Sequence, residues 1–354
     1  MPESDSFMKW VTRATAVFAL MFAVLQMVRT VVDVRDRRRQ ITELTGVEAE
    51  QKRSGDYERA WATLDQAVKI AESGGLLARL TGQLSTEARD LRAAQENLAM
   101  AWLDNLRLAP NQKFSDVVDR LAPVITRGVT TAAGPRKSDL LAHLGWASFL
   151  QTRDGKPGAD PEQQYRDALA ADRANPYAHA YLGHWLLWKG APLDQGDAEF
   201  EQALASGRAK DYVRTLQLAA LSNRGTEAQP RFVATVNDMR KHGEAVDATV
   251  RAAAYNVYTL ACGFRVDAEA MRALVAAAPP AEQADTLREL VVNDPRSDTG
   301  RRSTSEACVA TLLEAAGDRA GAIDAWQAVR KDAAPGDPNG LVKRADVALR
   351  RLAR

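Results

Sequence analysis

The longest apolar run of the chain lies near its N-terminus. Residues 14–28 read ATAVFALMFAVLQMV, without a charge, between Arg13 and Arg29. As a helix this run is ~22 Å long, shorter than a ~30 Å hydrocarbon layer, whereas a helix over residues 11–34 reaches ~36 Å. The two arginines then extend toward the headgroups and Trp10 lies at one interface. The pattern predicts a short tail over residues 1–12 and one transmembrane helix over residues 13–34.

Two other interpretations of this run stay open, an interfacial amphipathic helix and a docking helix for another protein. An interfacial helix needs a polar face, and the run offers only Thr15 and Gln26. A cleaved signal peptide is disfavoured, because no small-x-small site follows the run and a basic segment over residues 35–40 comes next.

Positive charge is unevenly distributed around the predicted span. Lys9 and Arg13 precede its core, whereas five arginines follow it: Arg29, Arg35, Arg37, Arg38 and Arg39. Lysine and arginine are retained on the cytoplasmic side, so we expect a single-pass protein of the inner (cytoplasmic) membrane with the bulk of the chain in the cytoplasm. The last four of these arginines are also candidates for binding anionic lipid headgroups. Alternatively, they act only as a topology signal.

Beyond residue 40 a helical pattern recurs with similar small and aromatic positions. Residues 55–67 read GDYERAWATLDQA, which places Ala60, Leu64 and Ala67 on one helix face after a turn glycine. Three further segments follow the same scheme of a glycine followed by an aromatic residue. These residues are Gly145 and Tyr165 in the first segment, Gly183 and Phe200 in the second, and Gly317, Ala322 and Trp326 in the third.

These segments resemble the tetratricopeptide repeat (TPR) family, in four copies over residues 41–74, 138–174, 175–208 and 303–336. The copies depart from the family pattern: Leu44, Leu141 and His179 replace its first aromatic residue, and residues 156–161 are an insertion. The resemblance implies an all-α, right-handed solenoid of helix pairs with a concave groove lined by the first helices.

The remaining segments carry further helix patterns between Pro/Gly breaks, and we expect degenerate helix pairs there. The expected regions are residues 41–130, 136–225 and 226–354, the last ending in a polar capping helix over residues 341–352. Further helices are expected over residues 86–108, 114–126, 231–243, 248–262, 268–277 and 281–291.

The TPR pattern assigns groove-facing positions to two consecutive first helices. These positions hold His143, Trp146, Phe149, Tyr177, Tyr181, His184 and Trp188. Tyrosine and tryptophan dominate interface hot spots, so this aromatic stripe is the candidate partner-binding surface. The alternative is that the same rings pack against an adjacent helix or against the insertion.

Composition and motifs narrow the possible chemistry. A net charge of +1 gives no global argument for nucleic-acid binding, and none is expected. Two cysteines, Cys262 and Cys308, are too few for a disulfide framework or a zinc ribbon, and we expect two separate buried side chains. No phosphate loop, dinucleotide turn, HExxH or GxSxG motif occurs. The four histidines form no metal-binding pattern, so we expect no metal, cofactor or enzymatic activity.

The sequence thus predicts a membrane-anchored, non-catalytic scaffold or adaptor that binds a partner protein in its groove. Two alternatives stay open. One is an envelope-facing, chaperone-like TPR protein with reversed topology, and the other is a regulatory or structural subunit of a larger membrane complex.

Overall fold

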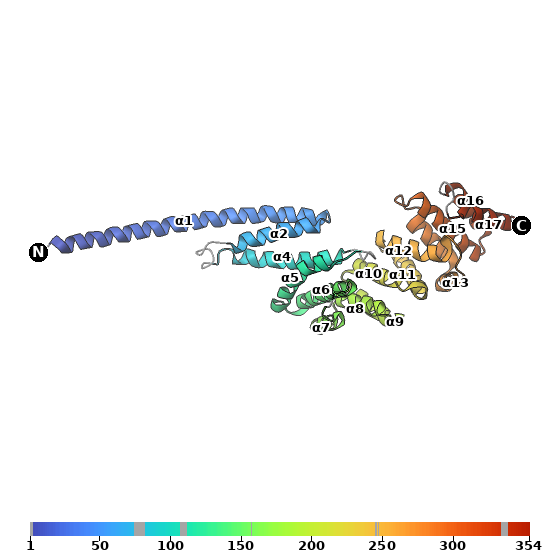
Figure 1. Cartoon of the computed structure of the whole chain (residues 1–354), viewed down its shortest axis with the longest axis horizontal. Coiled ribbons are helices and arrows are strands. Elements are labelled where there is room, and N and C mark those ends of the chain that lie inside the picture. Colours follow the sequence, from blue (N-terminus) through green and yellow to red (C-terminus); the bar gives the residue numbers. More distant parts are fainter. Residues whose placement is uncertain are drawn as a thin grey trace. The chain divides into compact units, whose positions relative to one another are not determined.

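The computed structural model describes residues 3–73, 82–106, 112–156, 158–244, 246, 248–333 and 339–354. These residues form helices joined by turns and contain no strand, which confirms the all-α prediction. The helices, drawn in Figure 1, are α1 (Glu3–Arg53), α2 (Tyr57–Glu72), α4 (Ser85–Asp104), α5 (Ser115–Thr131), α6 (Gly134–Arg153), α7 (Pro161–Ala171), α8 (Pro176–Trp188), α9 (Leu193–Ala205), α10 (Lys210–Ser222), η1 (Gly225–Ala228), α11 (Gln229–Lys241), α12 (Ala248–Tyr258), η2 (Thr259–Gly263), α13 (Ala268–Ala277), α14 (Pro280–Leu287), η3 (Arg288–Val292), α15 (Thr299–Ala315), α16 (Arg319–Asp332) and α17 (Leu341–Leu352).

Two compact units divide the chain. The first comprises residues 1–132 and 150–157, and the second comprises residues 133–149 and 158–354. The boundary passes through α6, whose last turn belongs to the first unit.

In the first unit, α1 is one uninterrupted helix of 51 residues, about 77 Å long. It contains no break at the expected ends of the tail, the transmembrane helix or the basic segment. No proline or turn glycine interrupts these residues, so the helix continues from the apolar run into the first helical hairpin. The N-terminal part of α1 extends beyond α2 and α4 (Figure 1).

The C-terminal half of α1 packs against α2, and α2 packs against α4, around a core of aliphatic side chains. Its buried members are Ile41, Ala60, Leu64, Ala67, Val68, Ala71, Leu91 and Leu98. The predicted face of α2 is therefore buried, because alanine at two of its positions allows close approach of the neighbouring helices. Asp56 caps α2 by accepting a hydrogen bond from the Arg59 amide.

In the second unit, consecutive helices pack as pairs, α8 with α9 and α15 with α16. α6 packs on α7 in the same way, with Ser138 Oγ donating to the Ala168 carbonyl over 2.7 Å. Within two pairs a glycine faces an aromatic ring: Gly145 faces Tyr165, and Gly183 faces Phe200. The α7, α8 and α16 helices begin at side-chain caps, Asp160, Asn175 and Asp318. The predicted insertion, residues 156–161, lies in the turn between α6 and α7 and ends at Pro161, the first residue of α7. Pro157 is outside the described residues.

Candidate partner-binding surface

Two neighbouring helices supply the predicted aromatic stripe. α6 carries His143, Trp146 and Phe149, and α8 carries Tyr177, Tyr181, His184 and Trp188. Trp146 stacks on Tyr181 with ring centroids 4.7 Å apart and an interplanar angle of 13°. Trp146 also stacks on Phe149 at 4.9 Å, and the His184 ring meets both at their edges. The helical spacing thus brings all seven side chains into one aromatic cluster.

Burial does not support an open groove over this cluster. The exposed fractions are 2% for Trp146, 1% for Phe149 and 0% for Tyr181, and both histidines are buried. Tyr212 of α10 covers the α8 side, with ring centroids 6.0 Å from Tyr177 and 6.1 Å from Tyr181. The expectation of a groove-facing position is therefore wrong for His143, Trp146, Phe149, Tyr181 and His184. Their rings fill the space between adjacent first helices, as the packing alternative predicts.

One end of the aromatic cluster remains accessible. Trp188, at the C-terminal end of α8, is 49% exposed and stacks on the Trp185 ring at 5.2 Å. Tyr177, in the first turn of the same helix, is half-buried. The Phe149 ring packs against Trp188 in an edge-to-face contact, with ring centroids 5.5 Å apart. An exposed indole on a rigid aromatic base presents apolar area at little conformational cost.

A charged network anchors the base of this indole pair. The indole N–H of Trp185 donates a hydrogen bond to Glu162 Oε2 over 3.2 Å. Lys189 bonds the same oxygen, and Arg166 bonds Glu162 Oε1 at 2.7 Å. These donors, Lys189 first, lower the pKa of Glu162 to about 2. Glu162 therefore stays ionised and holds the last turn of α8 against α7.

The arginines proposed to bind lipid headgroups have divided roles. Arg37 donates hydrogen bonds to the Ile70 carbonyl and to Ser73 Oγ, and Arg38 pairs with Glu87 at 2.6 Å. Both guanidinium groups therefore fasten α1 to the following hairpin. Arg35 is exposed, and Arg39, which pairs with Glu43 on its own helix, is largely exposed to solvent.

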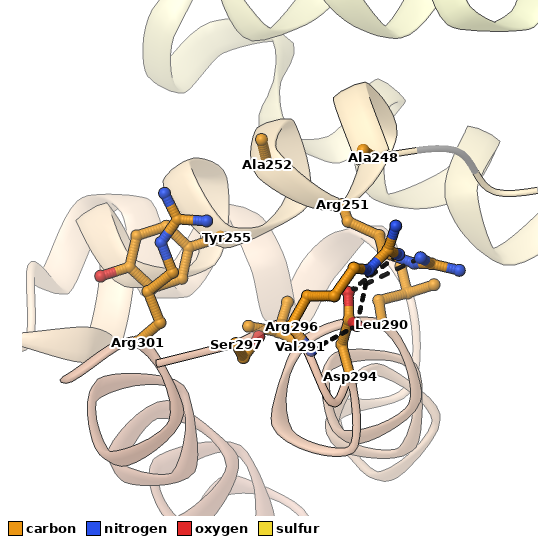
Figure 2. Close-up of a pocket in the computed structure, with 10 residues that line it drawn as sticks. All are labelled: Ala248, Arg251, Ala252, Tyr255, Leu290, Val291, Asp294, Arg296, Ser297 and Arg301. Carbon is orange, nitrogen blue, oxygen red and sulfur yellow. Dashed lines mark hydrogen bonds and ion pairs between the residues drawn. The ribbon is translucent and has the colours of Figure 1, made fainter. Parts of the chain in front are cut away.

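A small cavity of about 130 Å³ lies among α12, η3 and the turn that precedes α15. Figure 2 shows Arg251 and Arg296 converging on Asp294, with Arg301 on the other side over Tyr255. Arg296 reaches Asp294 at 3.1 Å and Arg251 reaches it at 3.6 Å. Asp298 pairs with Arg301 at 3.8 Å, so carboxylates offset two of the three positive charges.

Asp238, His242 and Glu244 are close enough to share a metal ion. Cationic side chains already occupy this position, however: Arg214 bonds Asp238 at 2.8 Å and Glu244 at 3.1 Å, and Lys210 bonds Glu244 at 2.7 Å. A divalent cation there faces two fixed positive charges, so the group acts as an ion-pair network between α10 and α11.

Cys262 and Cys308 form a disulfide between η2 and α15, with Cα atoms 4.7 Å apart. The expectation of two separate buried thiols is therefore wrong, although both residues are fully buried as expected. The two cysteines are 46 positions apart in sequence, and only the packing of η2 against α15 brings them together.

Comparisons with known proteins add little. No protein-family model matches the chain, and no curated protein matches it. Among solved structures, the crystal structure of yeast Tom70 is similar at 10% sequence identity, over 90% of this chain and 97% of that chain. Its TM-score is 0.20, a value at which the likeness carries no argument about fold or function.

Proposed function

We propose that this protein is a membrane-anchored, non-catalytic scaffold or adaptor of the TPR type that binds a partner protein. The observation that carries the proposal is the exposure of the apolar run of α1. Large apolar side chains between Val17 and Val32 are 53–70% exposed, whereas Val34 and Ile41 are buried by the following helices. An apolar face of this length that no described residue covers is typical of a helix that lies in a membrane or against another protein. Of the described residues, only this helix is long and apolar enough to cross a membrane.

The paired helices support the interaction part of the proposal. Two pairs use the combination of a small residue and an aromatic ring on which the TPR resemblance rests, Gly145 with Tyr165 and Gly183 with Phe200. Such pairs stack into extended surfaces that bind other proteins. A membrane tether then raises the local concentration of the bound partner without any further contact. Arg35 and Arg39 are the arginines that remain available for anionic lipid headgroups.

Because most rings of the aromatic cluster are buried, its exposed residue Trp188 is the candidate contact for a partner. We therefore place the partner on Trp188, not on the buried rings that support it. The experiment is a pull-down of cross-linked complexes from native membranes with the wild type and with Trp188→Ala. Val47→Ala, which truncates a similarly exposed side chain of α1, is the matched control.

We expect Trp188→Ala to lose the partner and Val47→Ala to retain it, with unchanged helicity in both variants. Equal recovery of the partner with both variants contradicts the assignment to Trp188. If both variants lose the partner, its binding does not depend specifically on the surface around Trp188.

The disulfide favours a second candidate, the envelope-facing protein with reversed topology. Disulfides persist in oxidising compartments and are rare in the cytosol. The positive charge after the span favours the opposite orientation, but Arg37 and Arg38 have a separate role in fastening the hairpin. Protease digestion of spheroplasts separates the two: degradation of residues 41–354 identifies the envelope-facing form, and their protection identifies the cytoplasmic form.

A further inference from the structure

A cleft near the C-terminal end of the second unit combines exposed apolar side chains with positive charge. It is formed by α15, α16, α17 and the turn before α13, and its volume is about 540 Å³. This volume is in the range of clefts that bind ligands or short peptide segments. Its lining includes Val266, Trp326, Lys343, Arg344, Val347 and Arg351.

Exposed apolar residues are concentrated around this cleft. Val266 is 49% exposed and Val347 is 53% exposed, and both line it. Phe264, two residues before Val266, is 48% exposed. The Trp326 ring forms part of the wall, so the cleft offers an apolar surface that favours burial by a partner.

The charges around the cleft are mostly positive. Lys343, Arg344 and Arg351 contribute three positive charges, and Glu314 contributes one negative charge. Glu314 is engaged internally, because it pairs with Arg351 and accepts the indole N–H of Trp326 at 2.6 Å. The cleft therefore has an excess of positive charge that an acidic ligand complements.

Arg344 is held rigidly at the base of this surface. Its guanidinium lies 5.0 Å from the centre of the Trp326 ring and donates to the Gly263 carbonyl and to Thr311 Oγ1, both neutral acceptors. Burial lowers the pKa of Arg344, although Glu314 acts in the opposite direction. A fixed, partly desolvated cation of this kind interacts more strongly with an incoming carboxylate than a fully solvated one.

We propose that this C-terminal cleft binds an acidic peptide segment of a partner protein, with an apolar side chain inserted between Val266 and Val347 and carboxylates facing Lys343 and Arg344. This surface is separate from Trp188, so the protein would have two docking sites. Its test therefore does not depend on the outcome at Trp188.

The experiment measures fluorescence polarisation of labelled synthetic peptides with the full chain in detergent micelles. One peptide carries a Leu-x-x-Phe pair flanked by glutamates, and its partner peptide has lysines in place of the glutamates. We expect the acidic peptide to bind and the basic peptide not to bind. We also expect the affinity of the acidic peptide to fall as salt is added.

Two variants in α17 test the location of the site. Val347→Asp places a charge in the cleft and should weaken binding of the acidic peptide by about tenfold or more. Arg350→Glu changes an exposed residue of the same helix that does not line the cleft, and it should have much less effect. Both side chains are exposed, and circular dichroism checks that both variants remain folded.

Three results overturn the proposal. The first is equal binding of the acidic and basic peptides, or no binding of either peptide. The second is an equal loss for Val347→Asp and Arg350→Glu, which indicates attraction to the overall charge of the helix. The third is a dimer in the wild type that Val347→Asp converts to a monomer in light scattering, which identifies a second copy of the chain as the occupant.

Discussion

The ring of Tyr165 occupies the space that a side chain at Gly145 would need. A Cβ atom at position 145 would lie 2.5 Å from Cε1 of Tyr165, closer than such atoms approach each other in proteins. Tyr165 itself is fully buried, so its ring has little room to move. This contact sets the separation of α6 from α7, and the shape of the pair depends on the absence of a side chain at one residue.

Gly145→Ala should therefore destabilise the second unit. Alanine is the better helix former, but the added methyl group forces either the Tyr165 ring or the α7 backbone to shift. Overpacking of this kind costs about 1–3 kcal/mol, which exceeds the gain in helix propensity of about 1 kcal/mol. Urea unfolding of the full chain in detergent, followed by circular dichroism, measures the difference.

Gly46→Ala is the matched control for this substitution. Gly46 lies inside α1 and is exposed, and among the described residues nothing beyond the adjoining backbone of α1 and the two neighbouring residues lies within 4 Å of the place that a Cβ atom would take there. We expect it to stabilise the helix by about 0.5–1 kcal/mol. A Gly145→Ala protein that is as stable as the Gly46→Ala protein contradicts the close approach of α6 and α7.

Glu162 should make stability depend on pH in the acid range. Its pKa is lowered from 4.5 to about 2 in the folded protein, chiefly by the hydrogen bond from Lys189. A lowered pKa means that the folded state favours the ionised form. The contribution is therefore fully present above pH 4.5 and is lost as the pH falls from 4.5 toward 2.

Glu162→Gln measures this contribution. The variant should unfold more easily than the wild type at pH 7, and the difference should shrink as the pH approaches 2. Thermal unfolding over this range provides the measurement. A difference between the two proteins that does not change with pH would mean that Glu162 acts through packing and not through its charge.

The disulfide should account for a measurable part of the stability of the C-terminal helices. Loss of a disulfide that closes a loop of this length typically costs about 2–4 kcal/mol. We expect reductant to lower the unfolding temperature of the wild type and to leave the Cys262→Ser/Cys308→Ser protein unchanged. Alkylation of both cysteines in denatured, unreduced wild-type protein contradicts the disulfide.

The sequence predicted structure within helices better than contacts between them. The face formed by Ala60, Leu64 and Ala67 is buried as its spacing indicates, because side-chain direction follows from helical geometry alone. The spacing of the aromatic residues also correctly predicts that they lie together, but it does not predict that most of them are buried. Whether the ring of Tyr181 faces a groove or a neighbour depends on the position of Tyr212, which lies 31 residues away in the chain.

Other features of the structure carry no local signal at all. The cysteine pair is brought together by the packing of η2 on α15, and no spacing rule relates residues 46 positions apart. The C-terminal cleft likewise combines residues of three helices and a turn. Its positive residues lie close together in α17, but its apolar residues Val266, Trp326 and Val347 come from separate elements and form no pattern along the chain. The continuity of α1 has a local signal, the absence of proline between the apolar run and the hairpin.

Arg37 should stabilise the junction between α1 and its hairpin. Its guanidinium donates to the Ile70 carbonyl and Ser73 Oγ at the end of α2, so Arg37→Ala removes partners from both groups. We expect faster amide hydrogen exchange over the last turn of α2. Arg39→Ala, which removes an exposed arginine two positions away, is the control, and equal exchange in the two variants contradicts this role.

The membrane anchor can be tested by placing charges in the apolar part of α1. Met21 and Leu25 lie one helical turn apart and are 54% and 65% exposed. An arginine near the centre of a spanning helix costs about 2.5–3.5 kcal/mol, so Met21→Arg together with Leu25→Arg should shift the protein from the carbonate-washed membrane pellet to the soluble fraction. The control is Glu43→Arg together with Val47→Arg, which places two arginines at the same spacing on the exposed face of the C-terminal half of the same helix and should leave the protein in the pellet. If both double variants stay in the pellet, α1 is not the anchor, and if both leave it, added charge alone explains the shift.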